Sequence, residues 1–129
     1  MTADRINQIA KLVLDAAFAV HSELGPGLLE SAYKACLVYE LNKRQIETRV
    51  EVPVPMIYDG TKLLDVGYRI DILVEGELVI EVKALEAIAP VHTAQLVSYL
   101  KLANRRLGLL INFNTVHLKD GIYRRVNGL

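Results

Sequence analysis

Apolar residues recur along this chain with two different periods, and each period predicts a different kind of element. A spacing of three to four residues over residues 4–24 and 28–44 predicts two amphipathic helices, the first with Asp4 as its N-cap. A spacing of two over residues 46–58 predicts a strand. Because Pro53 and Pro55 cannot donate to a ladder, this strand is expected at a sheet edge or at a bulge.

The second half of the chain shows shorter apolar runs bounded by turn residues. These runs predict strands over residues 63–74, 78–84 and 107–113, a helix over residues 90–104, and a final β-hairpin from residues 116–118 and 122–126. Asp59-Gly60 and Asp120-Gly121 are hairpin turn signals, and Gly67 is a candidate bulge. Residues 107–113 are expected to form an unbroken apolar strand. Since the pattern contains no linker or repeat, we expect a single α/β domain over residues 1–129.

Composition narrows the class of protein. The chain has 129 residues, of which 52% are hydrophobic, and its 15 basic and 15 acidic residues cancel. A nucleic-acid partner would therefore be held by a local patch and not by a global field. The single cysteine, Cys36, excludes a disulfide framework and suits a reducing compartment. No run reaches the ~20 apolar residues of a membrane span, so we expect a cytoplasmic protein without a membrane partner.

Three charged residues interrupt the two apolar strands from Tyr68 to Ala84, namely Asp71, Glu81 and Lys83. Charges inside such strands are costly unless they are paired or bind a metal. Side chains alternate along a strand, so Glu81 and Lys83 point to the same face. A three-residue loop at residues 75–77 would pair Val74 with Leu78 and place Asp71 opposite Glu81. We further expect Tyr68, Ile70, Ile72 and Val74 to form one apolar face opposite to Asp71.

Two carboxylates placed this closely repel each other unless a cation lies between them. Lys83 is one candidate cation, which would make the cluster a structural ion pair. A divalent metal is the other, and two oxygen ligands without a cysteine suit Mg²⁺ or Mn²⁺. A lysine beside such an ion is suited to positioning water or stabilising charge on phosphorus. The spacing of the residues alone leaves both interpretations open.

Several motifs in this order resemble a known family. Asp71 followed by Glu81-Val82-Lys83 across a hairpin is similar to the signature of the PD-(D/E)XK nuclease superfamily. The segment Leu24-Gly-Pro-Gly-Leu-Leu-Glu-Ser-Ala-Tyr33 resembles the motif of the GxxExxY proteins, a group within that superfamily. Segments 67–74, 92–100 and 107–113 also match that group, so the resemblance covers about residues 6–126.

This resemblance implies a fold and a set of site residues. The fold would be a PD-(D/E)XK restriction-endonuclease-like αβββαβ core with an extra N-terminal helix and a C-terminal β-hairpin. Asp71, Glu81, Glu30 and the backbone carbonyl of Val82 would bind Mg²⁺ or Mn²⁺, and Lys83 would be the catalytic lysine. From the residues alone, Glu30 is equally a first-turn acid that offsets the helix dipole.

Three residues of the predicted helix 90–104 are candidates to support this site. Gln95 and Tyr99 resemble the Q-x-x-x-Y element of some nucleases in the superfamily, and their i,i+4 spacing puts them on one helical face. Tyr99 by itself is also typical of an amphipathic core position. His92 is a candidate substrate contact, or a histidine that packs locally at the start of the helix.

Two functions follow from this interpretation. The first is a Mg²⁺-dependent nuclease that hydrolyses phosphodiester bonds of nucleic acid with metal-activated water, DNA being favoured over RNA. The alternative is a catalytically silent nuclease fold that binds nucleic acid or protein. The small size of the chain favours action as a homodimer or within a larger complex. Basic pairs at residues 43–44, 105–106 and 124–125 are candidate phosphate contacts or plain solvated surface.

Overall fold

The computed structural model describes all 129 residues as three helices, five strands and one 3₁₀ turn. In chain order the elements are α1 (Ala3–Leu24), α2 (Glu30–Lys43), β1 (Thr48–Tyr58), β2 (Thr61–Val74), β3 (Leu78–Lys83), α3 (Pro90–Ala103), β4 (Leu107–Asn112), η1 (Leu118–Gly121) and β5 (Ile122–Val126). The predicted mixed α/β fold with an N-terminal helix ahead of an αβββαβ core is confirmed. None of the helices is long and apolar enough to cross a membrane.

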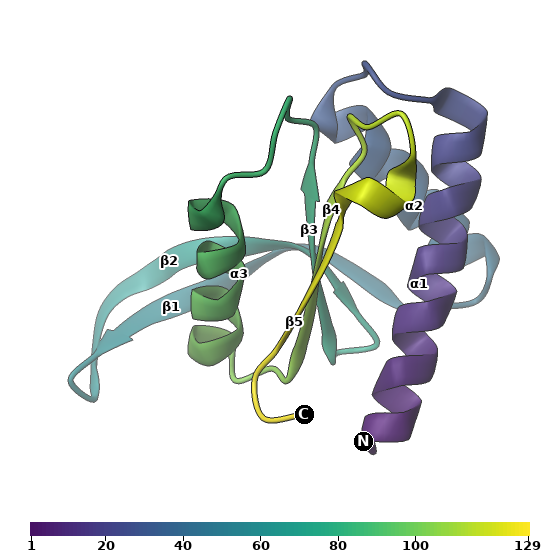
Figure 1. Ribbon diagram of the computed structural model, residues 1–129. Coiled ribbons are helices and arrows are strands. Elements are labelled where there is room, and N and C mark those ends of the chain that lie inside the picture. Colours follow the sequence, from purple (N-terminus) through teal and green to yellow (C-terminus); the bar gives the residue numbers. More distant parts are fainter.

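One mixed sheet organises the molecule, with its strands in the order β1-β2-β3-β4-β5. β3 and β4 run parallel, and the other neighbours are antiparallel. The parallel pair requires a crossover, which α3 supplies. α1 and α2 lie on one side of the sheet and α3 on the other (Figure 1). β3 and β4 are therefore covered on both faces, which explains why nearly all their residues are buried.

Two hydrophobic clusters lie on opposite faces of the sheet. The larger joins α1 and α2 to alternate strand residues such as Ile72, Ile80 and Val82. The smaller lies beneath α3 and contains Leu73 and Val79 from the intervening positions. Because strand side chains alternate, the residues that follow Val79 on its face of β3 also point toward α3.

β1 and β2 form a long ribbon that leaves the sheet. β2 pairs with β3 only from Ile72 to Val74, whereas its pairing with β1 continues to the Tyr58–Thr61 turn. The ribbon extends beyond α3 (Figure 1). β1 has no neighbour on its outer side, which confirms the edge position predicted from its prolines. The predicted bulge is also confirmed, because the β1–β2 register shifts between Val54 and Met56, opposite Gly67.

The prediction of one continuous apolar face on β2 was wrong. Ile72 and Val74 pack in the larger cluster, but Ile70 and Tyr68 pack with the cluster beneath α3. The alternation breaks between residues 70 and 72, where the facing residue of β1, Glu51, has a positive φ of 50°. This local twist turns β2 around at this point and brings Ile70 and Tyr68 beneath α3.

Two local predictions also needed correction. Thr2, not Asp4, is the N-cap of α1, since its hydroxyl accepts from the Arg5 N–H at 3.1 Å. Residues 116–118 form no strand: Leu118 starts the 3₁₀ turn, and β5 pairs with β4 instead. The reason is packing, because Leu118 is buried in the core and Gly121 lies so close to the Asn112 carbonyl that a Cβ would sit 2.2 Å from its oxygen.

Candidate active site

The hairpin between β2 and β3 has the register that places Asp71 beside Glu81. Val74 pairs with Leu78 and Ile72 with Ile80, so the loop contains three residues, as predicted. Continuing this register by one step puts Asp71 opposite Glu81. Both side chains lie on the face of the sheet that α3 covers, since Leu73 and Val79 are the next residues on that face.

Glu81 is a buried carboxylate with an unsatisfied oxygen. The residue is 6% exposed, and its Oε1 has no hydrogen-bond partner. Burial and the neighbouring Asp71 carboxylate raise the pKa of Glu81 to about 8, while the Lys83 ammonium opposes this rise. A buried polar atom without a partner costs free energy, so this oxygen is suited to a ligand that would bind it.

Asp71 is fixed by the backbone of β3. Its Oδ2 accepts a hydrogen bond from the Val82 N–H at 2.9 Å. This bond forms where β2 has stopped pairing with β3, so the side chain satisfies a backbone donor that the departing strand leaves free. The bond orients the Asp71 carboxylate beside Glu81.

Lys83 lies on the same face of the sheet as Asp71 and Glu81 but forms no ion pair with either. The structure contains four ion pairs, and none includes Lys83, Asp71 or Glu81. The interpretation of these charges as a structural Asp/Glu–Lys ion pair was therefore wrong. Lys83 is half-buried and its charge acts on Glu81, so its ammonium group remains available to a bound ligand.

A pair of stacked tyrosines stands beside the carboxylates. The rings of Tyr68 and Tyr99 are parallel within 7° with centroids 3.8 Å apart, and the Tyr68 hydroxyl donates to the Tyr99 carbonyl. Burial raises the pKa of both hydroxyls, and the Glu81 carboxylate raises them further. Tyr99 thus lies at the predicted site, whereas Tyr68 was missed, because regular strand alternation had assigned it to the opposite face.

Glu30 lies at the start of α2, and its neighbours in the motif hold that helix start in place. The Tyr33 hydroxyl donates to the Gly25 carbonyl at 2.6 Å and accepts from the Leu28 N–H at 3.1 Å. The Tyr33 ring stacks on Phe113 at 4.8 Å. The tyrosine therefore ties the α1–α2 loop to the core, next to the C-terminal ends of β3 and β4 (Figure 1).

Glu30 itself is exposed and accepts no hydrogen bond within the chain. No three of the His, Cys, Asp and Glu side chains form a group that would hold a metal ion. Asp71 and Glu81 are thus a pair, and Glu30 is not grouped with them. Its place in the first turn of α2 matches the helix-dipole role, and its role as a ligand stays a prediction.

The other two residues from α3 differ in their surroundings. His92 caps the helix, since its Nδ1 accepts from the Ala89 N–H at 2.8 Å, which leaves the proton of the neutral ring on Nε2. Gln95 is exposed one turn before Tyr99 and makes no hydrogen bond within the chain. Their roles toward a substrate are predictions.

Asn112 is a supporting residue that sequence reasoning missed. It lies opposite Lys83 in the parallel pair and is 2% exposed. Its amide donates to the Leu85 carbonyl and accepts from the Leu85 N–H, each at 3.0 Å. It therefore fixes the path of the chain directly after Lys83. A polar residue within the apolar run 107–113 was the available signal, and the prediction of an unbroken apolar strand was wrong here.

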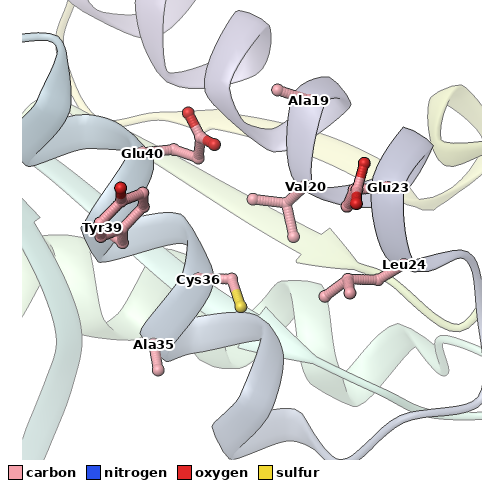
Figure 2. Close-up of a pocket in the computed structure, with 8 residues that line it drawn as sticks. All are labelled: Ala19, Val20, Glu23, Leu24, Ala35, Cys36, Tyr39 and Glu40. Atoms are coloured by element: carbon pink, nitrogen blue, oxygen red, sulfur yellow. The ribbon is translucent and has the colours of Figure 1, made fainter.

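The apolar pocket between α1 and α2 is separate from this cluster. It has a volume of about 240 Å³, and Val20, Leu24 and Cys36 point into it (Figure 2). Because α1 and α2 cover the opposite face of the sheet, this pocket does not communicate with Asp71 and Glu81.

The carboxylate pair fits a hard divalent cation. Its donors are oxygens only, one of them buried and without a partner, and a cationic Lys83 stands beside them. Mg²⁺ is characteristically held by one or two carboxylates and otherwise by water and substrate phosphate. A third protein carboxylate is not required for such a site, so the pair alone is compatible with this ion.

Comparison with known proteins gives one match. A family model described as the PD-(D/E)XK nuclease superfamily matches residues 7–126, nearly the whole chain. No curated protein and no solved structure matches the chain.

Proposed function

This chain belongs to the PD-(D/E)XK nuclease superfamily, and we propose that it is a Mg²⁺- or Mn²⁺-dependent nuclease that hydrolyses phosphodiester bonds, in DNA by preference. Within the superfamily we assign it to the GxxExxY group, on the segment from Leu24 to Tyr33. Its neutral net charge disfavours an extended duplex footprint, so a strand end or a single strand is the favoured substrate.

The buried Oε1 of Glu81 is the observation that carries this proposal. An acid with a pKa of about 8, one unsatisfied oxygen and a second carboxylate beside it is unfavourable in a structural role. A divalent cation removes each of these costs at once, because it neutralises both carboxylates and binds the free oxygen. Perturbed acids of this kind characteristically mark functional sites.

Asp71 and Glu81 would hold the ion, with the Val82 carbonyl and Glu30 as further candidate ligands. A bound Mg²⁺ or Mn²⁺ would supply Lewis-acid polarisation of the phosphodiester and a lowered pKa for water. Lys83, which has no ion-pair partner, would stabilise negative charge on the phosphorus centre or orient the attacking water. Gln95, Tyr99 and His92 would contact or position the substrate from α3.

A nuclease assay tests the proposal directly. Purified protein is incubated with Mn²⁺ or Mg²⁺ and with single-stranded, duplex and branched DNA and with RNA, and Lys83→Ala is compared with wild type. We expect cleavage by wild type and a loss of about a hundredfold or more in the variant. Lys11→Ala is the matched control, since Lys11 is an exposed lysine on α1. Equal cleavage by wild type and Lys83→Ala would contradict the assigned site.

Calorimetric titration with Mn²⁺ separates the nuclease from the non-catalytic alternative. We expect one binding event in wild type and none in Asp71→Ala or Glu81→Ala, whereas Glu86→Ala, which alters an exposed acid, should bind normally. If wild type binds no ion, or if both site variants bind it unchanged, the nuclease proposal fails. The chain would then be a nuclease fold that serves as a binding module.

A further inference from the structure

A pocket with two unpaired arginines lies between β1 and the C-terminal end of α3. Its volume is about 200 Å³, and Arg49 and Arg105 are its two charged lining residues. Val54, Ile70 and Leu73 contribute to its apolar floor. Arg49 pairs with Leu73 across the β1–β2 ladder, so its side chain leaves the sheet on the α3 face.

Neither arginine has an acidic partner. The four ion pairs of the structure all lie elsewhere, on α2, on β1 at Glu51 and on the outer ribbon. Two guanidinium groups that share a pocket repel each other unless an anion lies between them. The pocket thus has a net positive charge, although the whole chain has none.

Arg105 is held in place by backbone atoms. Its Nη1 donates to the Ala103 carbonyl at 3.0 Å and to the Asn104 carbonyl at 3.4 Å, at the C-terminal end of α3. Its Nε is buried and has no hydrogen-bond partner. A guanidinium that backbone carbonyls position in advance is suited to hold an anion such as phosphate.

The pocket lies on the same face of the sheet as the candidate active site, the face that α3 covers. Its floor residues Ile70 and Leu73 flank Asp71 on β2. Tyr68, which stacks on Tyr99 beside Glu81, is close enough to Arg105 to feel its charge. A chain that runs from the carboxylates past the tyrosine stack would therefore reach the two arginines.

We propose that Arg49 and Arg105 form a phosphate subsite that binds the nucleic-acid backbone at a nucleotide flanking the bond to be cut. This inference rests on the proposed nuclease function and adds to it the position of the substrate. The apolar lining favours a sugar–phosphate chain over a free phosphate ion, because a sugar ring would cover the partly exposed Val52, Pro55 and Ala103. An acidic protein segment would also satisfy two arginines, but a substrate phosphate is favoured because the pocket and the carboxylate site lie on the same face of the sheet.

Binding measured without cleavage tests the subsite. Fluorescence anisotropy follows a labelled single-stranded oligonucleotide in EDTA, from about 50 to 200 mM salt. We expect Arg49→Ala and Arg105→Ala each to weaken binding about tenfold, the effect of one lost charge-assisted hydrogen bond. Each should also reduce the slope of log K against log salt by about 0.7, as for one phosphate contact on a single strand.

Arg5→Ala is the matched control, because Arg5 is an exposed arginine on α1, at the opposite face of the sheet. Since Arg49 is exposed and has no ion-pair partner, its variant should fold normally even if Arg105→Ala does not. Unchanged affinity and slope in Arg49→Ala, an equal loss in Arg5→Ala, or no binding by wild type would overturn the subsite. So would a glutamate-rich peptide that displaces the oligonucleotide and loses affinity in the same variants.

Failure of the nuclease proposal would look different from failure of the subsite. In the first case wild type binds the oligonucleotide with the full salt slope but leaves it intact in Mn²⁺. In the second case wild type cleaves it, and Arg49→Ala and Arg105→Ala bind it as tightly as wild type does.

Discussion

The Asp71 carboxylate accepts a hydrogen bond from the backbone N–H of Val82 at 2.9 Å, at the point where β2 turns away from β3. One residue thus connects the architecture of the sheet to the candidate chemistry. The same side chain that closes the end of the β2–β3 ladder also stands beside the buried Glu81. If the proposed metal site is right, mutations at Asp71 should affect both stability and metal binding, and the two effects can be measured separately.

Asp71→Asn and Asp71→Ala should differ in stability but not in metal binding. Asparagine keeps an acceptor for the Val82 N–H, whereas alanine leaves that donor unsatisfied, at a cost of about 1–3 kcal/mol. Both variants lose the charge, so neither should bind Mn²⁺. Urea denaturation in EDTA measures the first effect and calorimetry the second. Equal stability of the two variants would mean that the hydrogen bond contributes little to folding.

Metal-free protein should become less stable as the pH rises from about 4.5 to 8. Burial and Asp71 raise the pKa of Glu81 to about 8 in the folded protein, against 4.5 for an unperturbed glutamate. Within this window the folded state keeps a proton that the unfolded state has released. The free energy of unfolding then falls by up to ~1.4 kcal/mol per pH unit. Urea titrations in EDTA at several pH values measure this slope.

Glu81→Gln is the control for that slope. Glutamine carries no titrating proton, so the variant should lose this contribution to the pH dependence and exceed wild type in stability at pH 8. A variant that is more stable and yet binds no Mn²⁺ would show that Glu81 is retained for binding. Identical slopes in the two proteins would rule out Glu81 as their source.

The sequence was sufficient to predict the part of the site that depends on local rules. A three-residue loop fixes the pairing of Val74 with Leu78, and strand alternation then brings Asp71, Glu81 and Lys83 to one face. These inferences need only neighbours in sequence. The same rules failed for Tyr68, because they assume that β2 is regular. The cause of its irregularity, the positive φ of Glu51, lies on the neighbouring strand β1.

Residues whose roles depend on distant segments were the hardest to predict. Asn112 bonds to Leu85, and Arg105 shares a pocket with Arg49, so both roles arise only once the sheet has formed. The turn at Asp120-Gly121 looked like a hairpin signal, but tertiary packing of Leu118 and Gly121 made it a 3₁₀ turn. A local signal is overridden where burial contributes more free energy than the turn does.

Tyr33→Phe should weaken the α1–α2 loop without disturbing the core. The change removes the hydrogen bonds to Gly25 and Leu28 but keeps the ring that stacks on Phe113. We expect a loss of about 1–2 kcal/mol, because the Gly25 carbonyl and the Leu28 N–H lose their partner. Thermal unfolding measures the loss. An unchanged melting temperature would mean that water replaces the hydroxyl and that the tyrosine serves packing alone.

Glu30→Gln should distinguish the two interpretations of the exposed acid at the start of α2. If Glu30 only offsets the helix dipole, the substitution costs about 0.3–1 kcal/mol of stability and leaves cleavage unchanged. If Glu30 takes part in the site, the substitution has the same small effect on stability, but cleavage in Mn²⁺ falls strongly. Glu23→Gln, at an exposed acid on α1, is the matched control. The proposed GxxExxY assignment, which makes Glu30 a candidate ligand, predicts the second outcome, and nuclease rates compared with melting temperatures decide between the two.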